Sequence, residues 1–243
     1  MKLTVMLFIP FFLFLSTIGC AKFDPYKPLT AEETQALLVK AKQSSRPAEP
    51  DRILSSEEIA AVLERVKATP VEPVDPREAA ILETNYGVIV IAFYPQEAPG
   101  HCSNFKRLVK AGYFDQTRFH RIIDGFVIQG GDILTRDEDP MNDGSGGPGY
   151  TIPAEFNGIP HDLGIVSMAR AQDPNSAGSQ FFICLSRERT RFLDGKYTVF
   201  GQVIGGLDVV QKIGRVPVKE SPFGEPSSPI EPVVLKQAFW IKR

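Results

Sequence analysis

The feature that most constrains this 243-residue sequence is a succession of short apolar runs in its last two thirds. These runs lie at 79–84, 88–93, 119–123, 126–128, 165–169, 181–185, 198–204 and 233–241. Between them, only 101–111 and 207–213 have the apolar spacing of helices. Because strands outnumber helices and do not alternate with them, the pattern predicts a mainly β domain, either an antiparallel sandwich or a closed barrel.

The preceding segment, 21–78, is divided by seven prolines and has a different composition. Capping boxes at Thr30–Glu33 and Ser55–Glu58 predict two short helices over 35–42 and 59–67. The proline-rich run 70–76 predicts an extended linker. We therefore expect a tether over 20–78 and a folded domain over 79–243.

The second of these helices carries an apolar stripe made of Ile59, Val62, Leu63 and Val66. Helices of this length are marginal when isolated, so the stripe is expected to pack on something. Two interpretations remain open. The helices of the tether form weakly or dock on the domain, or the stripe binds a partner helix or pairs two copies of the chain.

The first twenty residues have the pattern of a targeting segment. One lysine precedes an uncharged apolar run, 3–18, which is short for a spanning helix and ends in Gly19-Cys20. Residues 1–19 resemble a bacterial lipoprotein signal peptide, although Thr17 stands where such signals usually have Leu. The resemblance implies an exported protein held on a membrane by lipidated Cys20, in the periplasm or at the cell surface. A plain secretion signal and an uncleaved anchor are the alternatives.

Several function classes find no support in the sequence. The net charge of −2 lacks the basic excess of a nucleic-acid binder. The glycine-rich loop 144–149 lacks the Lys-Ser/Thr ending of a phosphate loop, and 139–150 lacks the glutamate of a calcium loop. The three histidines, His101, His120 and His161, share no metal-ligand spacing. We expect no metal and no cofactor.

The nucleophilic side chains show no catalytic setting. Ser179 does not lie in the strand-to-helix elbow of a serine hydrolase. Cys184 lies inside an apolar run, which predicts a buried free thiol. A disulfide between Cys102 and Cys184 is the alternative in an oxidising compartment.

The hairpin-like stretch 119–128 and the residue after it place polar side chains in runs that should be buried. Arg121 and Gln129 interrupt these runs, and buried polar groups cost free energy unless they are paired or used. The sequence around them resembles the cyclophilin family of prolyl isomerases. Four blocks carry the resemblance: Phe119-His-Arg-Ile-Ile-x-Gly-Phe-x-x-Gln-Gly-Gly-Asp132, Ser167-Met-Ala, Gly178-Ser-Gln-Phe-Phe-Ile183 and Leu193-Asp-Gly-Lys-x-x-Val-Phe-Gly201. It implies a closed eight-stranded antiparallel barrel capped by two helices, over nearly all of 79–243.

The resemblance also implies a set of site residues. Arg121 matches the family's catalytic arginine, and we place Phe126 and Gln129 with it as catalytic residues. The positions expected to contact substrate are His120, Val127, Ala169, Arg170, Ala171, Gln180, Phe182, Phe192, Leu193 and Tyr197. Three of these depart from common family members, which have Met at Val127, Trp at Phe192 and Asn at Arg170.

These residue types suit the reaction. Rotation about an Xaa-Pro bond must overcome about 18–20 kcal/mol of lost amide resonance, but it breaks no bond and needs no nucleophile. An arginine can donate to the prolyl nitrogen, which accepts a hydrogen bond only in the twisted state, so the bond lowers the barrier. If Arg121 and Gln129 share one site they must lie opposite each other. That requires an odd-length or bulged connection at Asp124-Gly125 rather than a two-residue turn.

The leading hypothesis is a lipid-anchored peptidyl-prolyl cis-trans isomerase that assists folding of exported proteins by acting on their proline-containing segments. One alternative is a module that binds or scaffolds proline segments with little turnover. Another is that 21–78 carries the biological role by docking on a membrane partner. Retention of Arg121 favours turnover, because a pure binder needs no donor for the twisted state.

Overall fold

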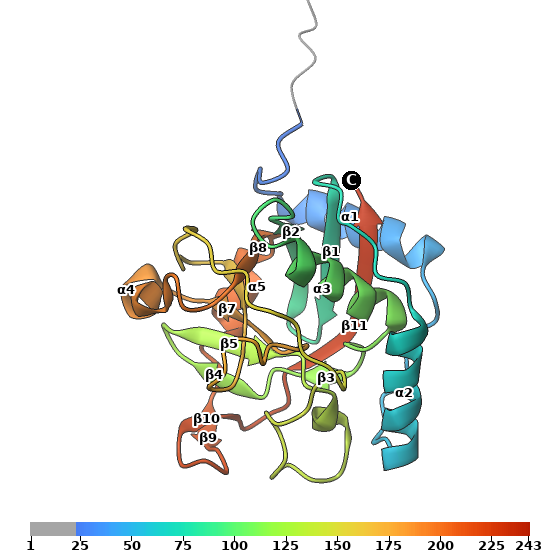
Figure 1. Ribbon diagram of the computed structural model, residues 1–243, viewed down its shortest axis with the longest axis vertical. Coiled ribbons are helices and arrows are strands. Elements are labelled where there is room, and N and C mark those ends of the chain that lie inside the picture. Colours follow the sequence, from blue (N-terminus) through green and yellow to red (C-terminus); the bar gives the residue numbers. More distant parts are fainter. Residues whose placement is uncertain (1–22) are drawn as a thin grey trace, which may run out of the picture.

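The computed structural model describes residues 23–243, so the predicted signal peptide and Cys20 lie outside the described residues. The strands are β1 (Glu78–Thr84), β2 (Gly87–Phe93), β3 (Thr117–Arg118), β4 (Arg121–Ile123), β5 (Val127–Gly130), β6 (Ile165–Met168), β7 (Phe181–Cys184), β8 (Val199–Gly205), β9 (Val218–Glu220), β10 (Pro226–Pro229) and β11 (Val234–Lys242). The helices are α1 (Ala31–Ser44), α2 (Ser56–Ala68), α3 (Pro99–Ala111), α4 (Arg187–Thr190) and α5 (Leu207–Ile213), with 3₁₀ turns η1 (Ile133–Arg136) and η2 (Arg191–Leu193) (Figure 1). No helix in this range is long and apolar enough to cross a membrane.

Within residues 23–243, nine strands form one antiparallel sheet in the order β3-β11-β1-β2-β8-β6-β7-β5-β4. Its two end strands, β3 and β4, are separated in the chain only by Phe119 and His120. One segment therefore pairs with β11 at its start and with β5 at its end, and the sheet curls round until both ends lie in that segment. The predicted mainly β barrel is confirmed. The sheet has nine strands instead of the predicted eight because this segment forms two short strands, β3 and β4, rather than one.

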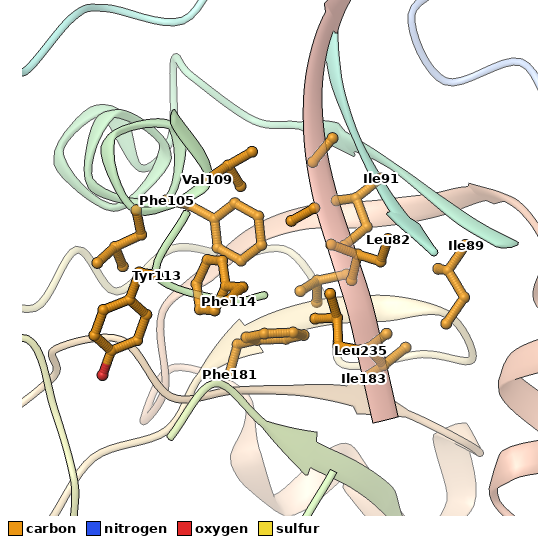
Figure 2. Packing of buried hydrophobic residues seen from close by; sticks show 14 of the residues in the cluster. Leu82, Ile89, Ile91, Phe105, Val109, Tyr113, Phe114, Phe181, Ile183 and Leu235 are labelled. Atoms are coloured by element: carbon orange, nitrogen blue, oxygen red, sulfur yellow. The ribbon is translucent and has the colours of Figure 1, made fainter. Parts of the chain in front are cut away.

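The inside of the curled sheet is filled by large apolar side chains (Figure 2). Phe105 of α3 packs against Phe114 and Phe181, with ring centroids 4.8 and 5.4 Å apart. Side chains from four strands surround these rings: Leu82, Ile89, Ile91, Ile183 and Leu235. Because side chains alternate along a strand, an inward residue implies an outward neighbour. Phe181 and Ile183 belong to this core, so Phe182 points to the outer face.

Helix α1 covers part of the outer face of the sheet. Leu38 and Ala41 are buried against outward side chains of β1, β2 and β11, among them Ile81, Val90 and Phe239. The capping box predicted at Thr30 is present, with the Thr30 hydroxyl accepting from the Glu33 amide. The strands β1 and β2 are therefore apolar on both faces, which explains why they lack the polar alternation of a solvated sheet.

Helix α2 packs against α3 and joins the main core. Ile59, Val62 and Val66 of its apolar stripe are buried there, and Leu63 is partly buried against the same cluster. The proposed contact of this stripe with a partner helix is wrong, because the chain's own core already covers it. The interpretation that the helices dock on the domain is the one that agrees with the structure.

Arginines fasten α2 and α3 to each other. Arg65 Nε donates to the Ala111 carbonyl at 2.6 Å, and Arg107 Nε donates to the Val66 carbonyl at 2.7 Å. Each arginine thus donates to a carbonyl in the last turn of the other helix, where positive charge is also favoured by the helix dipole.

The strands β9 and β10 form a separate two-stranded sheet that was not predicted. Four prolines interrupt 217–229, and proline rarely lies inside a strand. A two-stranded ribbon has only edges, so Pro226 and Pro229 are tolerated in β10. This β9–β10 hairpin packs beside β4 and so reaches the candidate site (Figure 1).

The two cysteines in the described range are both buried and free. The buried free thiol predicted for Cys184 is confirmed, and the disulfide with Cys102 is wrong. Burial raises the pKa of the Cys184 thiol to about 12, which keeps it protonated and unreactive at neutral pH.

Candidate active site

The hairpin of β4 and β5 brings Arg121 opposite Gln129. Ile123 pairs with Val127, which leaves residues 124–126 as a three-residue connection. Gly125 has φ of +66°, a left-handed conformation that a glycine adopts without a Cβ clash. The predicted odd-length connection is confirmed. Both side chains therefore lie on one face, with Arg121 Nη1 3.5 Å from Gln129 Oε1.

A hollow of about 200 Å³ opens beside Arg121 on the outer face of the barrel. Its floor is formed by Phe182 of β7 and Leu193 of η2, both buried. Tyr197 stands edge-on to Phe182, with ring centroids 5.8 Å apart. The whole lining consists of residues predicted for the site: Arg121, Phe126, Val127, Gln129, Ala169, Arg170, Phe182, Leu193 and Tyr197.

A larger neighbouring hollow, of about 650 Å³, contains two more of the predicted residues, Ala171 and Gln180. Gln129 Nε2 donates to Gln180 Oε1 at 3.1 Å. Gln180 Nε2 in turn donates to the carbonyls of Gly144 and Gly146 at 2.8 and 2.9 Å. A line of polar contacts therefore runs from the Arg121 end of the site to the glycine-rich loop.

Arg170 forms a wall of the site, and its guanidinium is stacked and hydrogen-bonded rather than free in solvent. Its guanidinium carbon lies 4.6 Å from the centroid of the Tyr197 ring. Its Nη1 donates to the Ala171 carbonyl at 2.8 Å, and its Nη2 donates to the Lys196 carbonyl at 3.0 Å. These contacts hold the arginine flat against Tyr197.

The last two predicted residues lie beside the main hollow. Phe192 is 58% exposed and stacks on Phe126 with ring centroids 5.8 Å apart. His120 lines a third hollow of about 210 Å³, the hairpin hollow, which lies between β4 and the β9–β10 hairpin. Burial lowers the pKa of the His120 imidazole and so favours its neutral form, and the Asp132 carboxylate acts in the opposite direction.

A residue absent from the sequence prediction makes the closest contacts to Arg121. The Nε of Arg121 donates to Glu225 Oε2 at 2.7 Å, and its Nη2 donates to Glu225 Oε1 at 3.0 Å. These hydrogen bonds lower the pKa of the Glu225 carboxyl. Glu225 lies 104 residues further along the chain, between β9 and β10 and outside all four family-like blocks. No local signal in the sequence could have identified it.

His161 supports the floor of the site from below. Its ring stacks on Phe182 with centroids 6.0 Å apart. Its Nδ1 lies 3.1 Å from Asp194 Oδ1, and its Nε2 lies 3.0 Å from Ser167 Oγ. The sequence suggested His161 only as a metal-ligand candidate without partners, whereas the structure gives it hydrogen bonds and a packing position.

The family comparison agrees with this geometry. The family model described as cyclophilin type peptidyl-prolyl cis-trans isomerase/CLD matches residues 79–238. A probable peptidyl-prolyl cis-trans isomerase of Brucella abortus is 42% identical over 146 residues, which are 58% of this chain and 74% of the relative. A peptidyl-prolyl cis-trans isomerase of Synechococcus elongatus is 47% identical over 123 residues, 51% of this chain and 78% of the relative.

Solved structures also resemble this chain. A cyclophilin type peptidyl-prolyl cis-trans isomerase of Cryptosporidium parvum, crystallised in the presence of the dipeptide Ala-Pro, has a TM-score of 0.59 and 32% identity. That likeness covers 68% of this chain and 99% of the other. A cyclophilin from Hirschia baltica has a TM-score of 0.55 and 26% identity, covering 78% of this chain and 86% of the other.

Proposed function

The chain belongs to the family of cyclophilin-type peptidyl-prolyl cis-trans isomerases, and on this premise we propose that Arg121 performs the catalytic step. The observation that carries the proposal is the position of Arg121 and Gln129, side by side at the wall of a small apolar hollow. We call that hollow, lined by the nine residues named above, the proline pocket.

The proline pocket would bind the prolyl ring of a peptide. Its volume of about 200 Å³ lies below the roughly 300–1,000 Å³ of pockets for drug-sized ligands. Phe182 and Leu193 give it an apolar floor, so a single small ring is held mainly by the hydrophobic effect. Crystallisation of the Cryptosporidium parvum relative with Ala-Pro supports a proline-containing ligand here.

With the ring held, the preceding carbonyl would rotate while Arg121 stabilises the twisted amide. The prolyl nitrogen becomes a hydrogen-bond acceptor only when amide resonance is lost. A donor from Arg121 therefore strengthens in the transition state and weakens again in either ground state, which is the condition for lowering a barrier. Arginine stays charged at any working pH, so the donor is always available.

The two glutamines would orient the peptide backbone. Gln129 and Gln180 are joined by a hydrogen bond, and Gln180 is fixed to the Gly144 and Gly146 carbonyls. Fixed neutral amides of this kind can hold a peptide in register without burying a further charge. Proline-containing polypeptide segments are therefore the proposed substrate class.

The test compares cis-to-trans exchange of an Ala-Pro peptide by the wild type and Arg121→Ala. Loss of a charge-assisted hydrogen bond of about 1.5–3 kcal/mol predicts a kcat/KM lower by about 10- to 150-fold. Arg118→Ala, an exposed arginine three positions earlier, is the matched control and should keep wild-type activity. If Arg121→Ala stays folded and fully active, the proposed mechanism is wrong. A folded wild type without turnover would favour the binding module.

We also propose that the enzyme acts on exported proteins while anchored by lipidated Cys20. The support is the sequence of residues 1–20, with its apolar run and Gly19-Cys20 ending. Cells expressing the full chain and fed a labelled fatty acid should label the wild type and not Cys20→Ser, and only the wild type should sediment with membranes. Equal membrane retention of Cys20→Ser without label would favour the uncleaved anchor.

A further inference from the structure

Arg121 stands between two hollows, and Glu225 contacts it from only one of them. Arg121 and Gln129 line both the proline pocket and the hairpin hollow, whereas Glu225 lines the hairpin hollow alone. A prolyl ring in the proline pocket and the Glu225 carboxylate would therefore occupy different spaces. Substrate can enter without displacing the carboxylate.

The contacts with Glu225 fix one edge of the guanidinium and leave N–H donors without a partner elsewhere on it. A guanidinium has five N–H donors in a planar fork. Glu225 takes one from Nε and one from Nη2, at 2.7 and 3.0 Å. Nη1 donates to Gln129 Oε1 at 3.5 Å, so one donor of Nη1 and the second donor of Nη2 remain for the substrate. The Phe126 ring, whose centroid is 5.9 Å from the guanidinium carbon, restricts one face.

Glu225 is itself held in place by the hairpin turn. The Ser221 amide donates to the Glu225 carbonyl at 2.7 Å, and the Glu225 amide donates to Ser221 Oγ at 3.3 Å. Gly224 has φ of +78°, which lets the chain turn tightly before Glu225. The Glu225 carboxylate is thus held by a loop that its own backbone hydrogen bonds close.

We propose that Glu225 is a positioning residue that aims Arg121 at the prolyl nitrogen. The proposal rests on the catalytic role of Arg121 given above. A free arginine side chain populates many rotamers, and fixing its guanidinium costs conformational entropy. If Glu225 has already fixed the guanidinium, this freedom need not be lost as the amide twists, and the donor is preorganised for the transition state. Glu225 then acts on the rate of rotation more than on peptide binding.

The first test is Glu225→Gln, which keeps the size of the side chain but removes its charge and one of the two acceptor oxygens. We expect kcat for an Ala-Pro peptide to fall about tenfold with KM within about twofold of the wild type, as for a misaligned catalytic group. The matched control is Glu220→Gln, an exposed carboxylate of the same hairpin, which should retain wild-type kcat. An unchanged or increased kcat in folded Glu225→Gln would overturn the proposal.

The second test uses only the wild-type protein, so its outcome does not depend on whether a variant folds. The Arg121 Nε–H resonance of the wild type is followed by NMR, with and without a saturating Ala-Pro peptide. A positioning contact predicts a downfield, slowly exchanging resonance that persists in the complex. Loss of that resonance on binding would show that peptide and Glu225 compete for Arg121, and the proposal would be wrong.

The two proposals fail in different ways. Full activity of Arg121→Ala would remove the catalytic role of Arg121 and the role of Glu225 with it. A large loss in Arg121→Ala, together with wild-type kcat in Glu225→Gln, would leave the catalytic arginine in place and reject only the positioning role.

Discussion

At the scale of single residues, the proline pocket depends on side chains that never touch it. Asp194 forms hydrogen bonds with Arg187 and His161, and the His161 ring stacks on the ring of Phe182. The pKa of the Asp194 carboxyl lies below its ordinary value of 3.8. The hydrogen bond from Arg187 is the largest cause, and hydrogen bonds from His161 act in the same direction. The charged carboxylate is therefore the form that the folded protein favours.

This gives a prediction for Asp194→Asn. The pKa of Asp194 is lowered by folding, so its stabilising effect is complete above about pH 4 and is lost as pH falls further. Since the side chain is about one third exposed, we expect the variant to lose only about 1 kcal/mol at pH 7. Urea unfolding between roughly pH 7 and pH 2 should show the difference from wild type shrinking in acid.

Asp51→Asn, at an exposed carboxylate, is the control and should match the wild type throughout. A difference for Asp194→Asn that stays constant or grows towards pH 2 would contradict the assignment of the charged carboxylate as the stabilising form.

The pocket residues could be predicted from sequence because most lie in or beside the short blocks that carry the resemblance to the family. Arg121, Gln129 and Phe182 are of this kind. Glu225 and His161 could not be predicted, because their roles depend on contacts with residues far away in the chain. A glutamate in a proline-rich loop and a lone histidine carry no local signal of their partners.

At the scale of elements, strands were predictable where apolar residues form an uninterrupted run. The β4–β5 pairing followed from the requirement that Arg121 and Gln129 share a face. The helices α1 and α2 were visible in their capping boxes, but their docking was not. An apolar stripe shows that a surface is covered without showing what covers it. The β9–β10 hairpin was missed because its prolines suggested a loop.

Docking of α2 predicts a stability effect at Val66, which is fully buried. Val66→Ala removes two methyl groups from the contact with α3, and we expect a loss of about 2 kcal/mol. Val71→Ala makes the same change at a residue that is 62% exposed, and should have little effect. Chemical denaturation measures both.

Activity at low denaturant should be unchanged in both variants. The helix α2 lies on the side of the molecule away from α4 and β4, which flank the site (Figure 1). Equal stability of Val66→Ala and Val71→Ala would show that α2 is not docked in solution.

At the scale of the whole molecule, the segment before β1 belongs to the folded body. Tyr26 donates to the Phe93 carbonyl at 3.2 Å, and Lys106 of α3 donates to the Pro73 carbonyl at 3.0 Å. Contacts therefore begin within a few residues of Cys20 and continue through the linker. An anchor at Cys20 would hold the barrel close to the membrane, with no long tether between them.

The strands that carry the site would then lie at a distance from that membrane. In Figure 1 the N-terminal end of the described chain leaves at the top, while β4, β5 and the β9–β10 hairpin lie towards the opposite end. A long polypeptide could reach the proline pocket without first approaching the lipid. The orientation of the barrel on the membrane, rather than a long tether, would make the proline pocket accessible to substrates.

The same contacts predict that residues 79–243 alone are not a stable domain, although the family match covers nearly all of them. Removing 23–78 uncovers outward side chains such as Ile81 and Phe239, and takes Val62 and Val66 from the main core. Each buried aliphatic or aromatic side chain contributes roughly 1.5–3 kcal/mol, against a total stability of about 5–15 kcal/mol for a domain. We therefore expect 79–243 to aggregate or to melt without cooperativity, and 23–243 to melt in one transition by calorimetry. Adding a separate 23–78 peptide should restore the transition. A cooperative melt of 79–243 within a few degrees of 23–243 would mean that the helices only rest on a barrel that folds without them.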